Sequence, residues 1–159
     1  MADSKKAPDF GATISVVIPT FKRPNLALKA AQTIRAYHSD VKITIIDQQG
    51  GANINEDEIR KFNIKLVNLS VENTSVAKNR GIKETSGEII FFFDDDIEIT
   101  KDTIPYQLKE YDDPLIVGTC GRVLNDHETI PANTDVSTGK MNWIGTEFLQ
   151  QFWSTRKQE

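Results

Sequence analysis

The sequence predicts an α/β fold in which a mostly parallel sheet carries helices on both of its faces. Short apolar runs with the length of buried strands alternate along the chain with segments whose apolar residues recur at helical spacing. This alternation is typical of consecutive βαβ units. The 159 residues have the length of one domain, and a content of 38% hydrophobic and 26% charged residues is that of an ordinary globular protein.

The individual elements follow from apolar periodicity and from the residues that begin and end helices. The expected strands cover residues 13–19, 42–47, 64–69, 88–93 and 115–123, and the expected helices cover residues 24–38, 55–62, 74–87 and 101–111. Pro24 suits the first turn of a helix. Thr74 or Ser75 is expected to cap the third helix and Thr100 the fourth, because a hydroxyl can accept from the free N–H groups of a first turn. Gly87 is expected to end the third helix.

The chain divides into three parts. Residues 1–12 are expected to form a flexible N-terminal segment, and residues 13–123 the α/β domain itself. Residues 124–159 are expected to form a polar, turn-rich loop and then a terminal helix. The apolar face of that helix would consist of Ile144, Phe148, Phe152 and Trp153.

Composition excludes some classes of function. The formal net charge is −4 and the chain has no basic block, which argues against a nucleic-acid partner because such binding depends on neutralising phosphates. A single cysteine, Cys120, cannot form an intramolecular disulfide, so a reducing compartment fits best. No apolar run reaches the length of a membrane span. The expected location is the cytoplasm, with the cytosolic face of a membrane as the alternative.

The stretch "GEIIFFFDDDIEIT" places three carboxylates directly after a buried strand. We call Asp94, Asp95 and Asp96 the acidic motif. Two unit charges about 4 Å apart repel by roughly 4 kcal/mol at an intermediate dielectric, so stability does not explain the cluster. Clustered carboxylates without His or Cys are hard oxygen ligands, which Mg²⁺ and Mn²⁺ prefer. The alternative is a solvated acidic turn before the next helix.

Other polar residues are expected at the same edge of the sheet. Thr20 ends the first strand and Asp47 ends the second, and ligands of open α/β sheets bind beyond the carboxyl ends of the strands. In a 3-2-1-4 strand order the first and fourth strands are neighbours, so Thr20 and the acidic motif would line one cleft.

Three segments, "SVVIPTFKRPNLALKAAQTI", "ITIID" and "NTSVAKNRGIKETSGEIIFFFDDDIEI", resemble the nucleotide-binding half of the family 2 glycosyltransferases, which have the GT-A fold. The resemblance covers residues 13–123. It implies a metal-dependent, inverting transfer of a sugar from a nucleoside-diphosphate sugar, usually a uridine one, to an acceptor hydroxyl. Cell-wall or polysaccharide biosynthesis is the expected setting.

The resemblance also implies roles for individual residues. Asp94 and Asp95 would bind the nucleotide, and Asp94 and Asp96 would hold the Mn²⁺ or Mg²⁺ ion. Four further residues would contact the substrate, with Asp47 facing the base, Thr20 and Phe21 bordering the nucleotide and Lys78 in place of a common arginine. A turn cap at Asp47, an ordinary turn after the first strand and a solvated helix face at Lys78 are the structural alternatives.

The sequence does not single out a general base for the acceptor. Asp126, Asp135 and Glu147 are the candidates downstream of the fifth strand, none with a persuasive context. The family's acceptor-side region is expected to be incomplete in this chain. A non-catalytic or truncated nucleotide-sugar-binding module is therefore the main alternative. A nucleotidylyltransferase would need a Gly-rich loop after the first strand, and "PTFKRPN" contains no glycine.

Overall fold

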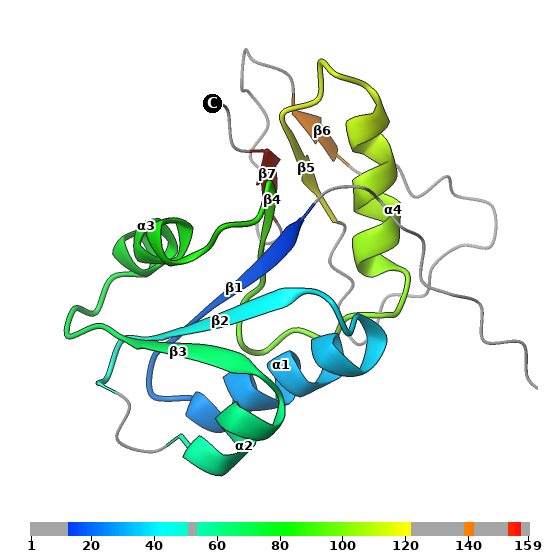
Figure 1. Cartoon of the computed structure of the whole chain (residues 1–159). Helices are drawn as coiled ribbons and strands as arrows, with labels where there is room; N and C mark the ends of the chain where they lie inside the picture. The colour runs from blue at the N-terminus through cyan, green and yellow to red at the C-terminus, as the bar shows by residue number, and fades with distance from the viewer. Residues whose placement is uncertain (1–12, 51–53, 122–138, 142–152, 157–159) are drawn as a thin grey trace, which may run out of the picture.

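The computed structural model describes residues 13–50, 54–121, 139–141 and 153–156. Within these ranges seven strands form one sheet in the order β3-β2-β1-β4-β7-β5-β6 (Figure 1). The strands are β1 (Ile14–Thr20), β2 (Lys42–Asp47), β3 (Ile64–Asn68), β4 (Ile89–Phe92), β5 (Gly118–Cys120), β6 (Gly139–Met141) and β7 (Trp153–Arg156). The expected 3-2-1-4 order of the first four strands is confirmed.

The sheet has a parallel part and an antiparallel part. The strands β3, β2, β1 and β4 are parallel to one another, and Thr20 at the end of β1 lies opposite Asp47 at the end of β2. β7 pairs antiparallel with both β4 and β5, and β6 pairs antiparallel with β5. The parallel part therefore brings the carboxyl ends of β1, β2 and β4 to one edge.

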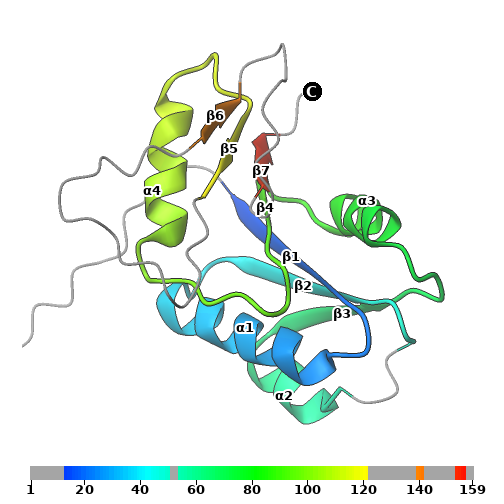
Figure 2. The same ribbon diagram turned by 180° about the vertical axis from the view of Figure 1, so that it is seen from behind.

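Helices cover both faces of the sheet, as predicted. They are α1 (Pro24–Tyr37), α2 (Glu56–Lys61), α3 (Thr74–Glu84) and α4 (Thr103–Lys109), and a 3-10 turn, η1 (Glu110–Asp112), follows α4. Two views from opposite sides show α1 and α2 together on one face and α3 on the other (Figures 1 and 2). Among the described residues, no helix combines the length and hydropathy that a membrane crossing requires.

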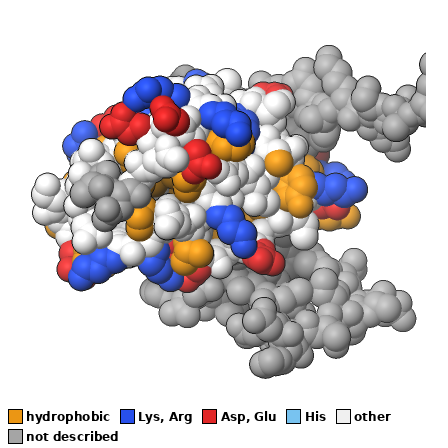
Figure 3. All heavy atoms as spheres, turned by 90° about the horizontal axis from the view of Figure 1, so that it is seen from below, with side chains coloured by type: hydrophobic (Ala, Val, Ile, Leu, Met, Phe, Trp, Pro, Cys, Tyr) orange, Lys and Arg blue, Asp and Glu red, His pale blue; other side chains and the backbone are white. Residues whose placement is uncertain are grey.

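Two hydrophobic cores result from the strand alternation. Val16 and Ile18 of β1 face the larger core, to which α1, α2 and α4 contribute, whereas Val17 faces the smaller core beneath α3. Gly81 allows α3 to approach the sheet closely, because a Cβ atom at this position would lie 2.3 Å from Cγ1 of Val17. On the face seen from below, positive and negative side chains of the described residues are interspersed (Figure 3).

The helix ends differ from the predicted ones. Asn73, not Thr74 or Ser75, caps α3, and its side-chain oxygen accepts from the N–H of Val76 at 3.0 Å. The helix ends at Glu84. Gly87 instead lies two residues before β4, where a Cβ atom would lie 2.6 Å from the backbone nitrogen of Ser15.

The predicted cap of α4 is also wrong. The helix begins at Thr103, and the preceding Asp102 makes no side-chain cap. Thr100 uses its backbone N–H to donate to the Thr103 hydroxyl at 3.0 Å. Thr100 therefore belongs to the turn that leads into α4 and not to the helix end.

The expected terminal helix is wrong at Trp153, which lies in strand β7. A strand here gives β4 a second neighbour, so that β4 has β1 on one side and β7 on the other. The strand β6, at residues 139–141, likewise lies within the predicted polar loop. Ile144, Phe148 and Phe152 lie outside the described residues.

Candidate functional site

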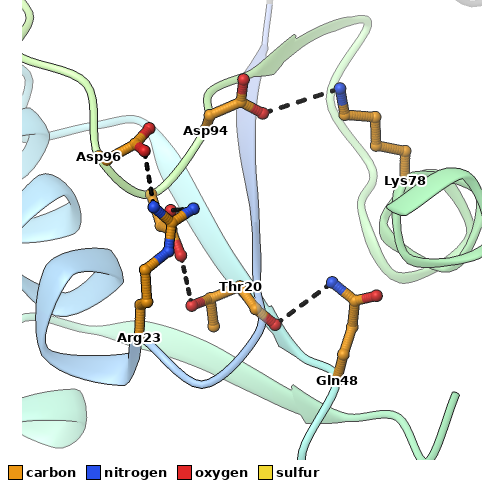
Figure 4. Close-up of polar contacts among 7 residues, drawn as sticks. Thr20, Arg23, Gln48, Lys78, Asp94 and Asp96 are labelled. Carbon is orange, nitrogen blue, oxygen red and sulfur yellow. Dashed lines mark hydrogen bonds and ion pairs between the residues drawn. The ribbon is translucent and has the colours of Figure 1, made fainter. Parts of the chain in front are cut away.

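Thr20, Asp47 and the acidic motif lie at the carboxyl edge of the parallel strands, as predicted. The ladder between β1 and β4 continues past β4, since the N–H of Phe93 donates to the carbonyl of Val17 at 3.1 Å. The acidic motif therefore begins directly beside the last residues of β1. Figure 4 shows Asp94 and Asp96 above the end of β1, with Thr20, Gln48 and Lys78 around them.

Asp95 is the inward-facing member of the acidic motif and is only 3% exposed. Its Oδ2 accepts a hydrogen bond of 2.6 Å from the Thr20 hydroxyl. Its Oδ1 lies 2.6 Å from the Nη2 atom of Arg23, which makes an ion pair although the geometry is not that of a hydrogen bond. Burial raises the pKa of Asp95, and the Thr20 hydroxyl and Arg23 oppose that rise. Asp95 thus anchors the motif to β1.

Arg23 joins two members of the acidic motif. Its Nη1 donates to Oδ2 of Asp96 at 2.7 Å (Figure 4). Its Nη2 pairs with Asp95 at 2.6 Å. The hydrogen bond to Asp96 is the main cause that raises the pKa of Arg23. The backbone directs this side chain, because Lys22 has a left-handed φ of 59° and Pro24 begins α1 immediately afterwards. Arg23 therefore neutralises part of the repulsion that the sequence predicted.

Asp94 points away from Arg23 and towards helix α3. Its Oδ1 lies 3.8 Å from the ammonium nitrogen of Lys78 (Figure 4). Burial raises the pKa of Asp94, and the charge of Lys78 opposes the rise. Arg80, two residues further along α3, instead pairs with Glu84 at 2.7 Å. Of these two cations, Lys78 is the one directed at the acidic motif.

A second group of polar residues holds the ends of β1 and β2 to the start of α3. The side chain of Gln48 donates to the carbonyl of Thr20 at 3.3 Å and accepts from the backbone N–H of Asn73 at 2.8 Å. Asp47 is 3% exposed, and its Oδ1 accepts from the N–H of Gln49 at 3.0 Å. The turn-cap interpretation of Asp47 is therefore part of its role.

Phe21 is the partly buried residue that follows β1, and the ammonium group of Lys22 lies 4.5 Å from the centre of its ring. Phe21 therefore follows Thr20 at the edge of the site, and its role in binding stays a prediction. Asp126, Asp135 and Glu147 lie outside the described residues.

A cavity of about 260 Å³ lies on the α1 side of the acidic motif. Asp95 and Asp96 line one side of it, and Leu26, Lys29 and Tyr37 of α1 line the other. Asp47 and Lys78 are not among its lining residues. The polar edge that holds Asp47, Asp94 and Lys78 therefore does not line this cavity.

The donor set decides what kind of metal site is feasible. Among the described residues, no three Asp, Glu, His or Cys side chains are arranged as a metal cage. Asp94 and Asp96 are partly exposed, with side-chain accessibilities of 30% and 51%. Mg²⁺-type sites often use only one or two protein carboxylates and complete their ligands with substrate phosphates. By residue type Asp94 and Asp96 suit such a site, while in this structure Asp94 is directed at Lys78 and Asp96 at Arg23.

Two residues of the site, Arg23 and Gln48, were not predicted. Arg23 could have been found from the strand order, because it follows β1 by three residues and β1 neighbours the strand that carries the acidic motif. Gln48 offered no such signal, since its side-chain bonds depend on where the loop before α3 runs.

Comparison with solved structures supports the fold. A mannosyltransferase from Pyrobaculum calidifontis, solved with GDP-Man and Mn²⁺, superimposes with a TM-score of 0.58 at 20% identity, over 73% of this chain and 38% of that chain. Glucosyl-3-phosphoglycerate synthase from Mycobacterium tuberculosis, solved with Mn²⁺, UDP and glucosyl-3-phosphoglycerate, gives 0.56 at 20% identity, over 69% and 43% of the two chains. S. aureus TarS with UDP-GlcNAc gives 0.58 at 16% identity, over 75% and 37%. These likenesses confirm the predicted GT-A architecture.

Sequence comparison supplies the family. An uncharacterised glycosyltransferase of Rickettsia conorii is 35% identical over 100 residues, which is 60% of this chain but 17% of the relative, and the same figures hold for one from Rickettsia felis. The chain thus spans about a sixth of the length of these curated relatives. The sequence profile of glycosyl transferase family 2 matches residues 15–157. That match covers most of the chain and confirms the resemblance, so the chain belongs to glycosyl transferase family 2.

Proposed function

We propose that this chain binds a nucleoside-diphosphate sugar at the carboxyl edge of β1, β2 and β4 and supports transfer of its sugar to an acceptor hydroxyl. The observation that carries the proposal is the placement of the acidic motif beside Thr20, with Asp47 at the same edge. Membership of glycosyl transferase family 2 supports it. The structural neighbours described above include complexes with GDP-Man, UDP and UDP-GlcNAc.

Each residue has a place in this proposal. Asp47 faces the base, which we take to be uracil, and Phe21 borders it. Asp94 and Asp96 hold a divalent cation, Mn²⁺ or Mg²⁺, which neutralises charge on the diphosphate when it is bound. Asp95 stays fixed by Thr20 and keeps its two neighbours oriented.

The reaction requires stabilisation of the leaving diphosphate. Breaking the bond to the anomeric carbon places negative charge on the departing diphosphate, and cationic groups fixed at that position lower the barrier. The distance of 3.8 Å between Lys78 and Asp94 supports a contact of Lys78 with the same diphosphate. An inverting reaction also needs a base within hydrogen-bond reach of the acceptor hydroxyl. Asp126, Asp135 and Glu147 remain the candidates for that base.

A thermal-shift panel tests the proposal. We expect UDP or a UDP-sugar, in the presence of Mn²⁺, to raise the melting temperature more than GDP or TDP does. A ligand at about 100 times its dissociation constant stabilises a protein by roughly 2.7 kcal/mol. With chelator the effect of UDP should largely disappear. Unchanged melting with every nucleotide, with and without metal, would contradict the proposal.

A donor-consumption assay then separates catalysis from binding. Release of UDP from a UDP-sugar by the chain supports the transferase function. Nucleotide binding without any release supports the donor-binding module. The variants Asp126→Asn, Asp135→Asn and Glu147→Gln identify the base when release is observed.

A further inference from the structure

We infer that Arg23 is the built-in counter-ion of the acidic motif and that it competes with a divalent cation for Asp96. The inference rests on the proposed function, because the cation concerned is the one assigned there to Asp94 and Asp96. It adds a positioning residue that governs how tightly that cation binds.

The contacts show why Arg23 has this role. One guanidinium group lies 2.6 Å from Oδ1 of Asp95 and donates to Oδ2 of Asp96 at 2.7 Å. Hydrogen bonds between ionised partners are shorter and stronger than neutral ones. Arg23 thus offsets the repulsion between adjacent carboxylates while no cation is bound.

The two carboxylates differ in what else holds them. Asp95 has a side-chain accessibility of 2%, and it accepts from Thr20 through Oδ2, which is not the oxygen that pairs with Arg23. Asp96 is half exposed, and its Oδ2 is directed at Arg23. A cation that binds Asp96 must therefore replace the guanidinium group of Arg23 at this carboxylate, while Asp95 stays in place.

Arg23 is able to withdraw without breaking the fold. Its side chain is 50% exposed, and it lies at the N-terminal end of α1, where its side chain makes no helix cap. A guanidinium left in place would stand close to a divalent cation at Asp96, and like charges at that separation repel strongly. Cation binding at Asp96 should therefore displace Arg23 from this carboxylate.

Direct measurement of Mn²⁺ binding tests the competition. Free Mn²⁺ is followed by electron paramagnetic resonance, at low salt and without nucleotide, for the natural chain, Arg23→Gln, Arg23→Lys and Arg60→Gln. Arg60 is 70% exposed on α2 and pairs with Glu56, so its variant removes one positive charge far from the motif. We expect Arg23→Gln to bind Mn²⁺ about tenfold more tightly, equivalent to about 1.4 kcal/mol. Arg23→Lys should fall between, and Arg60→Gln should match the natural chain.

The outcomes separate this inference from the proposed function. Mn²⁺ binding by the natural chain that Arg23→Gln leaves unchanged or weakens would overturn the competition and leave metal dependence standing. Absence of Mn²⁺ binding in both without nucleotide would overturn the competition at Asp96. The metal assignment would then be judged by the thermal-shift panel, in which UDP can complete the ligands of the cation and the chelator removes it. Circular dichroism shows whether each variant is folded.

A second measurement needs no variant in the site. In the natural chain labelled with ¹⁵N, the Nε–Hε resonance of Arg23 should shift on titration with Mg²⁺ as the guanidinium leaves Asp96, whereas that of Arg60 should not. A resonance of Arg23 that stays unchanged at saturating Mg²⁺ would overturn the inference even if Arg23→Gln proved unstable.

Discussion

Ion pairs join the side chains at the ends of β1 and β4, whereas hydrogen bonds between side chains and backbone groups join the end of β2 to the start of α3. We call the first group, Thr20, Arg23 and the acidic motif, the charged half of the edge. We call the second group, Asp47, Gln48 and Asn73, the Gln48 half. The charged half includes partly exposed ion pairs at Asp94 and Asp96, and the Gln48 half uses bonds to backbone groups.

The difference indicates a division of labour. Exposed ion pairs contribute little to stability, typically up to about 1 kcal/mol, so a bound ligand can replace them at small cost. Hydrogen bonds between a buried side chain and the backbone fix the relative position of the elements that they join. We therefore expect Asp94 and Asp96 to exchange partners on binding, and Asp95 and the Gln48 half to keep their geometry.

The largest expected effect comes from breaking the charged half. Asp96→Ala should lower Mn²⁺-dependent affinity for UDP by about 100-fold or more, because even indirect supports of metal ligands cost about 10- to 100-fold in metal affinity. Asp47→Ala should instead reduce the preference for UDP over GDP and leave Mn²⁺ binding in place. Calorimetric titration of both variants with Mn²⁺ and with each nucleotide measures the split. Equal losses in the two variants would contradict it.

Breaking the Gln48 half should show in stability and not in metal binding. Gln48→Met keeps the length of the side chain but removes its bonds to Thr20 and to Asn73, each worth about 0.5–1.5 kcal/mol. The N–H of Asn73 also contacts the carbonyl of Val71 at 3.1 Å and so retains a partner. We expect the free energy of unfolding in urea to fall by about 1–3 kcal/mol, equally with Mn²⁺ and with chelator.

The matched control for this change is Gln49→Met. Gln49 is the neighbouring exposed residue, and its backbone N–H keeps its bond to Asp47 in the variant. Its unfolding free energy should stay within about 0.5 kcal/mol of the natural chain, as is usual for surface changes. A loss of unfolding free energy in Gln48→Met no greater than in Gln49→Met would show that the bonds of Gln48 to Thr20 and Asn73 do not stabilise this edge.

The sequence predicted most of the residues at the carboxyl edge of the sheet but not the contacts of Arg23 and Gln48 that join them. Periodicity located the first four strands, and the rule that ligands bind beyond parallel strand ends placed Thr20, Asp47 and the acidic motif together. The strand order places Arg23 close to the acidic motif, but the direction of its side chain also depends on the left-handed φ of Lys22, which no local pattern indicates. The prediction of a terminal helix was wrong at Trp153 for a related reason, because β7 pairs with β4 and β5, which lie far away in the sequence.

The smallest expected effect concerns pH, and it tests whether Asp95 is the buried anchor of the charged half. Burial is the main cause that raises the pKa of Asp95 above that of an aspartate in an unfolded chain. Between the two pKa values the folded state binds more protons than the unfolded state, so the free energy of unfolding falls as pH rises through this window. Above the folded pKa the loss is complete.

Asp95→Asn should remove this contribution, because the amide does not titrate in the window and its oxygen can still accept from Thr20. Urea unfolding in chelator, measured at several pH values from about 4 to 7, should show the natural chain losing stability relative to the variant as pH rises, by no more than about 1.4 kcal/mol per pH unit. Comparing the two chains cancels Glu84, whose pKa is lowered chiefly by its hydrogen bond with Lys65 and which acts in the opposite direction. Asp57→Asn, on the exposed side of α2, controls for the loss of one negative charge. A difference between the natural chain and Asp95→Asn that is constant with pH would mean that Thr20 and Arg23 balance burial at this carboxylate. A difference that grows in the natural chain's favour as pH rises would mean that they outweigh it.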